Sequence, residues 1–148
     1  MKPETAVKFE RRFGRFFFPF HRWLFKTTRG YVGGRFEGRP MLLLRHVGRK
    51  TGEQRETLIQ YYPRGDEMVV VGSNGGRPNA PAWLHNVQAN PDVGVEIRGK
   101  RLKARARVLD GSEREAMWEE LYDFYTGYKH YQTLTDRRIE VVALTPEP

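Results

Sequence analysis

The chain contains no cysteine, and this absence excludes several functions before any motif is considered. Without thiols there is no disulfide framework, no thiolate nucleophile, no iron–sulfur cluster and no cysteine-based zinc site. No stretch approaches the roughly 18 continuous apolar residues that a membrane-spanning helix requires. The N-terminus lacks the features of a secretory signal peptide, because charges interrupt its aromatic run and no small-residue cleavage site follows. The sequence therefore predicts a cytoplasmic protein.

Serine and histidine are also scarce, which argues against two further classes of active site. Ser73 lies in a glycine-containing segment, but Val71 stands where a nucleophile elbow requires glycine. The histidines show no metal-ligand spacing, so we expect packing or surface roles and no metal site for His21, His46, His85 and His130. No Walker motif and no dinucleotide-binding glycine pattern is present.

Positive charge is plentiful but unevenly distributed. The 148 residues carry a formal net charge of +8, and the length corresponds to one ordinary domain. Residues 1–40 contain ten basic and three acidic residues, and residues 41–107 contain twelve and six. Residues 108–148 are acidic, with four basic and nine acidic residues. This distribution indicates that positive charge is placed where anionic groups bind, rather than serving only solubility.

The first forty residues differ from the remainder of the chain. Apolar residues between Phe9 and Leu24 recur in steps of three and four, with basic residues on the opposite arc, which predicts a helix. Pro19 is expected to divide this helix into two short pieces. A glycine-rich connector follows, so we expect a basic aromatic extension over residues 1–40 and a separate folded domain over residues 41–148.

From residue 41 the apolar period changes to two, which predicts strands. Two helices are also expected, one over residues 81–89 capped by Asn79 and one over residues 112–124 opened by a Ser112–Glu115 capping box. Turns are predicted at residues 48–52, 63–66 and 99–100. The predicted strands cover residues 41–47, 55–62, 68–71, 93–97, 101–108 and 139–144. Six mostly antiparallel strands with few helices favour a mainly β (α+β) fold, a small barrel with helical additions.

Two glycine-containing turns could bind an anion. Gly48–Gly52 includes Arg49 and Lys50 and is followed by Arg55; glycines allow close backbone approach and guanidinium groups suit phosphate. The turn Gly72–Gly76 follows a strand and can present backbone N–H groups. Each turn is also compatible with a plain structural role, as a solvated hairpin tip or as a loop between a strand and a helix.

A tyrosine cluster is the remaining chemical feature. Tyr122, Tyr125, Tyr128 and Tyr131 recur every three residues across the end of the predicted helix. Such a cluster can simply seal a core. It can also border the mouth of a site and offer flat walls with hydroxyl groups to a conjugated ring or a carbonyl.

These motifs together resemble the deazaflavin (coenzyme F-420)-dependent nitroreductases of actinobacteria, from about residue 41 to the C-terminus. The resemblance rests on several segments in order: Leu43-Leu44 before Gly48-Arg49-Lys50-Thr51-Gly52, Val70–Gly76, Pro81–Asn86 with Ala89-Asn90-Pro91, and Tyr131-Gln132 with Thr135–Ile139. It implies a split β-barrel of the flavin-mononucleotide-binding type. It also implies the cofactor coenzyme F-420, whose phosphate and glutamate tail are anionic.

The resemblance also implies roles for individual residues, carried over position by position. The phosphate and tail are expected to be held by Arg49, Lys50 and Arg55, supported by Ser73, Asn74 and Gly75. The deazaflavin ring is expected to lie near Pro81, Ala82 and Trp83. The substrate is expected to border Tyr125, Tyr128 and Tyr131. One departure concerns Asn74, where family members often carry lysine.

The implied reaction is hydride transfer from reduced coenzyme F-420 to an electron-poor acceptor, such as a quinone, an activated enone or lactone, or a nitro compound. We expect Tyr128 to polarise the acceptor.

A reductase that uses flavin mononucleotide on the same barrel is the nearest alternative. A basic nucleic-acid-binding module is a third interpretation, which no recognition motif supports. Residues 8–26 are expected either to contact an anionic membrane peripherally or to form a lid. The sequence does not predict the oligomeric state.

Overall fold

The computed structural model describes residues 35–36 and 39–148. The predicted helix of residues 9–24 and the predicted membrane contact of residues 8–26 lie outside the described residues. The predicted division at residue 41 therefore stays a prediction. None of the helices in the described part of the chain is long and apolar enough to cross a membrane.

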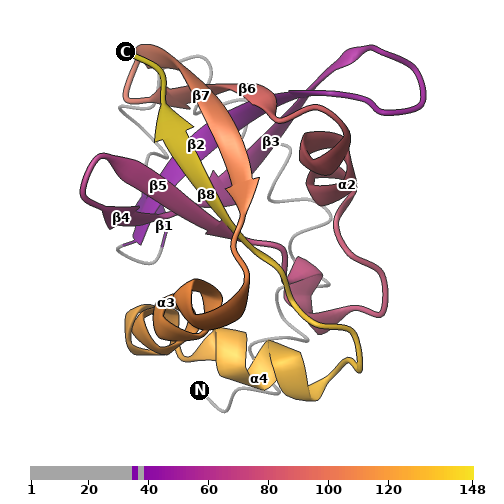
Figure 1. Ribbon diagram of the computed structural model, residues 1–148, viewed down its shortest axis with the longest axis vertical. Coiled ribbons are helices and arrows are strands. Elements are labelled where there is room, and N and C mark those ends of the chain that lie inside the picture. The colour runs from indigo at the N-terminus through magenta and orange to yellow at the C-terminus, as the bar shows by residue number, and fades with distance from the viewer. Residues whose placement is uncertain (1–34, 37–38) are drawn as a thin grey trace.

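The described residues form one antiparallel sheet with helices beside it (Figure 1). The order of the strands is β1-β2-β6-β7-β8-β5-β4, and β3 pairs with β2 outside this path. The helical elements are η1 (Asn74–Gly76), α2 (Ala82–Ala89), α3 (Gly111–Phe124) and α4 (Gly127–Thr133). The strands are β1 (Arg35–Phe36), β2 (Arg39–Val47), β3 (Gln54–Gln60), β4 (Tyr62–Arg64), β5 (Glu67–Val71), β6 (Asp92–Ile97), β7 (Lys100–Val108) and β8 (Val141–Pro146).

Two hydrophobic cores lie on opposite faces of β5 and β8. Because successive side chains of a strand point to opposite faces, Val69 and Val71 join the core under α3 and α4, whereas Met68 and Val70 join the core beside α2. The same alternation divides the residues of β8 between the two cores. This explains why every residue of the run 68–71 is apolar, which is typical of a strand buried on both faces.

The sequence prediction of mostly antiparallel strands with helical additions is confirmed, and several details are corrected. Eight strands replace the expected six, because β1 and the three-residue β4 are too short to give a periodic signal. Pro63 and Arg64 belong to β4, so the turn is confined to Gly65 and Asp66. The β6–β7 turn is formed by Arg98 and Gly99, which have φ values of 47° and 79°, one residue earlier than predicted.

Both predicted helix caps are wrong. Helix α2 has Pro81 at its N-cap, and the Asn79 side chain does not cap it. Helix α3 begins at Gly111 with Asp110 at its N-cap, so the Ser112–Glu115 capping box does not form. In both cases the N-cap lies two residues away from the position that side-chain chemistry alone favoured.

Candidate functional site

The basic turn connects β2 to β3 and projects from the sheet (Figure 1). Its backbone closes on itself, because Gly52 N–H donates to Gly48 O and Gly48 N–H donates to Glu53 O, both at 2.8 Å. Gly52 has a φ of 73°, which explains why a glycine ends the turn. The three cations predicted to bind the anionic cofactor are therefore displayed on a short, hydrogen-bonded hairpin.

A pocket of about 700 Å³ lies between this turn and α2. It is lined by the three predicted cations, by one carboxylate and by a tryptophan that is only 5% exposed. Its walls consist of His46, Gly48, Arg49, Lys50, Thr51, Gln54, Arg55, Glu56, Thr57, Ala82, Trp83 and Asn86. The volume lies within the range typical of cofactor and ligand sites.

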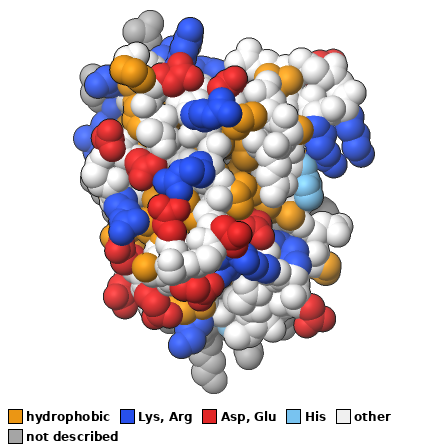
Figure 2. Space-filling view, in the orientation of Figure 1, with side chains coloured by type: hydrophobic (Ala, Val, Ile, Leu, Met, Phe, Trp, Pro, Cys, Tyr) orange, Lys and Arg blue, Asp and Glu red, His pale blue; other side chains and the backbone are white. Residues whose placement is uncertain are grey.

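The charge of this pocket is not cancelled by its surroundings. Within the described residues, the side chains of Arg49 and Lys50 have no acidic partner, whereas Arg55 pairs with Glu53 at 3.3 Å. Elsewhere arginines and acidic residues intermingle on the surface (Figure 2). The arginines of β7 illustrate this, because Arg101 pairs with Glu96, Arg105 with Asp92, and Arg107 with Glu67 and Glu113. Among the described residues, the turn thus displays two cations, Arg49 and Lys50, without an acidic partner.

A buried polar network forms the floor of the pocket. His46 and Asn86 are 4% and 5% exposed, and their side chains are joined by a 3.0 Å hydrogen bond between Asn86 Nδ2 and His46 Nδ1. Asn86 Oδ1 accepts from the backbone N–H of Arg49 at 3.0 Å. His46 Nε2 lies 3.0 Å from Thr57 Oγ1. Burial, and then the nearby Arg55 guanidinium, lower the pKa of His46, which favours the neutral imidazole.

The second glycine turn lies beside this pocket rather than in its wall. Ser73, Asn74 and Gly75 are half-buried, and Asn74 has a φ of 46° while its Nδ2 donates to Asn79 O at 2.9 Å. This bond closes the loop and suits asparagine, which tolerates the left-handed region well. Asparagine therefore has a structural reason at this position, where the resemblance led us to expect lysine.

Arg137 fixes the same turn from the other side. Its guanidinium donates to three backbone carbonyls, those of Gly72 at 3.1 Å, Ser73 at 2.8 Å and Arg77 at 3.1 Å. Desolvation lowers the pKa of Arg137. A second pocket of about 510 Å³ adjoins the first, shares Arg49 and Ala82 with it, and is bounded by Arg49, Pro78, Asn79, Ala80, Ala82, His85 and Arg137.

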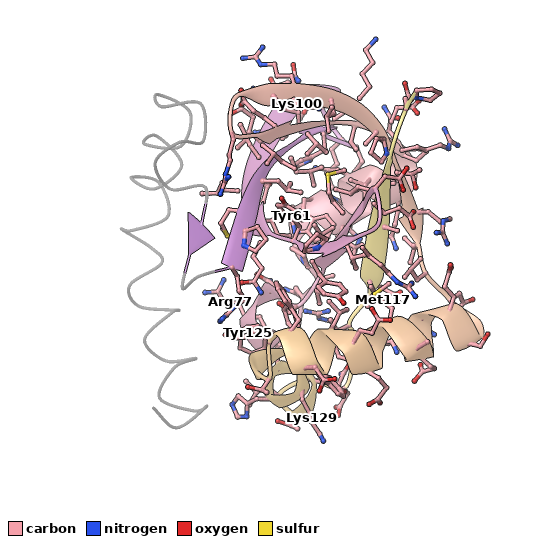
Figure 3. The ribbon with its side chains drawn as sticks, turned by 90° about the vertical axis from the view of Figure 1, so that its left-hand side faces the viewer. Tyr61, Arg77, Lys100, Met117, Tyr125 and Lys129 are labelled. Atoms are coloured by element: carbon pink, nitrogen blue, oxygen red, sulfur yellow. The ribbon has the colours of Figure 1, made fainter. Side chains whose placement is uncertain are left out.

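The tyrosines form a separate cluster. Tyr128 and Tyr131 are 6% and 3% exposed and belong to the core under α3 and α4. Tyr128 Oη accepts a hydrogen bond from Gln60 Nε2 at 2.7 Å, and the hydroxyls of Tyr125 and Tyr131 lie 3.0 Å apart. Tyr125 lies between the helices and the sheet, where Arg39 stacks 4.2 Å from its ring centroid (Figure 3). Neither pocket has a tyrosine in its wall.

The structure therefore brings together five of the predicted site residues in one pocket: Arg49, Lys50, Arg55, Ala82 and Trp83. The others lie in neighbouring elements: Pro81 at the start of α2, residues 73–75 in the second turn, and the tyrosines in the helical layer. Sequence reasoning missed His46, Thr57 and Asn86. Asn86 belongs to a segment on which the resemblance rests, but nothing in the sequence distinguished His46 from a packing histidine.

The donor set of the larger pocket suits a phosphorylated cofactor with an acidic tail. Its three cations have the chemistry for charge-assisted hydrogen bonds to anionic groups. Trp83 offers an apolar face, and Gln54 and Thr51 offer neutral hydrogen-bonding groups. Residues that bind metals do not gather here; no cluster of three or more His, Cys, Asp or Glu suited to a metal occurs within the part of the chain that the structure describes.

Comparisons with known proteins agree with this chemistry. A family model described as F420H(2)-dependent quinone reductase matches residues 18–146. A protein named F420H(2)-dependent quinone reductase from Mycobacterium tuberculosis is 35% identical over 140 residues, covering 92% of this chain and 94% of its own.

Two solved structures are also similar to this chain. One titled as an F420-H2 dependent reductase is 38% identical, with a TM-score of 0.65, and covers 72% of this chain and 94% of its own. Another, titled as a domain-swapped dimer, is 33% identical, with a TM-score of 0.67, and covers 97% of this chain and 99% of its own. The predicted split β-barrel is confirmed. The family model and the mycobacterial relative name quinone reductases, so enones, lactones and nitro compounds as acceptors stay predictions.

Proposed function

We propose that this chain, which belongs to the F420H(2)-dependent quinone reductase family, reduces a quinone with a hydride from reduced coenzyme F-420. The observation that supports this proposal is the pocket in which Arg49, Lys50 and Arg55 surround a polar floor next to Trp83. When bound, the deazaflavin supplies the hydride. The protein binds and orients both reactants and excludes water from them.

The cations are proposed to hold the anionic part of the cofactor. Arg49 and Lys50 have no acidic partner among the described residues, so an anion gains their full attraction without first displacing a carboxylate. Arg55 contributes less, because Glu53 already engages it at 3.3 Å. Ser73, Asn74 and Gly75 are proposed to support the same end of the cofactor. Pro81, Ala82 and Trp83 are proposed to pack near the ring.

The acceptor side is proposed to involve the tyrosine cluster. Gln60 Oε1 accepts from Arg39 Nε at 3.2 Å, which orients the amide so that Gln60 Nε2 donates to Tyr128 Oη. The oxygen of Tyr128 is thus held in place from the sheet side. We propose that Tyr128 polarises the acceptor carbonyl and that Tyr125 and Tyr131 border it. Activated enones, lactones and nitro compounds are proposed as further acceptors, because each is electron-poor at the reacting atom.

An anaerobic titration with coenzyme F-420 and, separately, with flavin mononucleotide tests the proposal. We expect tight binding of the deazaflavin and weak binding of flavin mononucleotide. Arg49→Ala and Lys50→Ala should each weaken F-420 binding about fivefold to tenfold, which corresponds to roughly 1–1.4 kcal/mol. Lys103→Ala on the exposed face of β7 is the matched control and should leave the dissociation constant unchanged.

Turnover of a benzoquinone, an enone and a nitroaromatic with reduced coenzyme F-420 then defines the acceptor class. Preference for flavin mononucleotide, or equal affinity of the turn variants and the control, contradicts the assignment of cofactor and site. Full turnover of all acceptors by Tyr128→Phe contradicts the proposed role of Tyr128. This result does not bear on the proposed cofactor site.

A further inference from the structure

Within the described residues, one backbone hydrogen bond joins the basic turn to an element outside the β2–β3 hairpin. Within the described residues, its backbone hydrogen bonds all lie inside the β2–β3 hairpin, except the 3.0 Å bond from Arg49 N–H to Asn86 Oδ1 on α2. Arg49 and Lys50 are exposed, whereas Asn86 is buried. The contact therefore fixes how far the exposed turn lies from α2, and so the width of the pocket between them.

The hydrogen bonds at this contact can run in one direction only. The backbone N–H of Arg49 is a donor, so the Asn86 atom that faces it is the amide oxygen. Asn86 Nδ2 is then a donor toward His46, and His46 Nδ1 must accept. The imidazole proton consequently lies on Nε2, where it is donated to Thr57 Oγ1. The chain from Arg49 through Asn86 and His46 to Thr57 links the turn, α2, β2 and β3.

We propose that Asn86 and His46 are positioning residues for the anion-binding turn. Asn86 holds the peptide group of Arg49, and the Nε2-protonated neutral tautomer of His46 holds the Asn86 amide in the orientation that makes this possible. The inference deepens the proposed function, because it assumes that the Arg49 turn binds the anionic part of the cofactor. Arg49 also contributes to the wall of the second pocket, so its displacement alters both cavities.

A proton on His46 Nδ1 is incompatible with this arrangement. It would place a donor against Asn86 Nδ2, and rotation of the amide would in turn place Nδ2 against the Arg49 N–H. One hydrogen bond is lost in either case. The charged groups that share the pocket with His46 are Arg55 and Glu56 on β3, and Arg49 and Lys50 in the turn. Three of these four are cations, which favours the neutral ring.

Two substitutions at Asn86 in the full chain test the inference. Asn86→Leu removes both hydrogen bonds. The Arg49 amide should then exchange with solvent at least tenfold faster, and F-420 should bind about tenfold more weakly. Asn86→Asp retains an oxygen for the Arg49 N–H but presents only acceptors to His46. The Arg49 amide should stay protected, while His46 gains a proton on Nδ1. Gln88→Leu, at an exposed position of α2, is the matched control and should change none of these quantities.

Nitrogen NMR of the His46 ring and amide hydrogen exchange at Arg49 provide readouts independent of catalysis. In the unsubstituted protein near pH 7 we expect an Nε2-protonated neutral ring and an Arg49 amide protected relative to that of Lys50. A proton on Nδ1, an unprotected Arg49 amide, or unchanged exchange in Asn86→Leu overturns the inference. If Asn86→Leu does not fold, the unsubstituted protein and Asn86→Asp still decide it. If the unsubstituted protein fails to bind F-420, the proposed function is wrong, and the two NMR readouts still decide the positioning role.

Discussion

Two adjacent glycines in the second turn, Gly75 and Gly76, are required for different physical reasons. Gly75 and Gly76 have φ values of 63° and 76°. A Cβ at Gly75 would meet open space, whereas a Cβ at Gly76 would lie 2.9 Å from Tyr131 O and 3.0 Å from Leu134 Cβ. The first glycine is thus required by backbone conformation alone, and the second also by the close approach of α4.

Alanine substitutions should separate these two causes. We expect Gly75→Ala to lower the free energy of unfolding by about 1 kcal/mol, the cost of the left-handed conformation. Gly76→Ala should cost about 1–3 kcal/mol more, because backbone atoms must move to accommodate the new methyl group. Urea denaturation measures both differences. Equal losses for the two variants would show that α4 yields to the added methyl without cost.

The end of α4 and the segment that follows it hold the second turn in place through hydrogen bonds. Gln132 Nε2 donates to Arg137 O at 2.8 Å, Ile139 N–H donates to Gln132 Oε1 at 3.0 Å, and Arg137 reaches three carbonyls of the turn. These residues belong to the last motif of the family resemblance. Their contacts join this motif to the glycine turn, from which it is distant in sequence.

Removing the Arg137 guanidinium should therefore loosen the turn. We expect Arg137→Met to lower the free energy of unfolding by about 2 kcal/mol, because charge-assisted bonds to carbonyls are lost and the apolar stem is retained. Amide exchange at residues 73–77 should accelerate in the same variant. Arg138→Met removes ion pairs with Asp110 at 2.9 Å and Glu140 at 3.6 Å and a 3.5 Å hydrogen bond to Leu109 O. Because the Arg138 side chain is about half exposed, this variant should change little. Similar losses in the two variants would contradict the role assigned to Arg137.

The strands were predicted from the sequence more accurately than the helix caps, and the difference has physical reasons. The strand over residues 68–71 was evident because two cores demand apolar residues on both of its faces. The exposed basic residues of β7 were also evident, since one face of this strand meets solvent. The caps of α2 and α3 were mispredicted because the path of the backbone into each helix depends on the preceding strand or loop, which the local sequence does not encode.

At the scale of the whole molecule, the buried His46 links stability to pH. An ordinary histidine has a pKa of 6.5, and burial with Arg55 lowers the pKa of His46 in the folded protein. Between these two values the unfolded chain binds more protons than the folded chain, so acidification favours unfolding. The contribution of His46 to stability is fully present above pH 6.5 and is lost as the pH falls toward its folded-state pKa.

Urea denaturation at pH 7.5, 6.5 and 5.5 should show this dependence. We expect the free energy of unfolding to fall over the acidic part of the range, and His46→Gln to flatten the slope. His85→Gln, at an exposed position of α2, should leave the slope unchanged. An identical slope in His46→Gln and the unsubstituted protein would assign the pH dependence to other groups.

The sequence by itself determined the class of the fold and the place of the basic turn, and its resemblance to a known family implied the cofactor. The first two depend on local information: apolar periodicity reports which faces are buried, and glycines next to cations mark an exposed, positively charged turn. Only the tertiary structure decided that Trp83 and Ala82 face that turn across a pocket, and that His46 and Asn86, forty residues apart, form its floor. Buried hydrogen bonds between distant segments depend on the relative placement of strands and helices, and no periodicity or spacing records that placement.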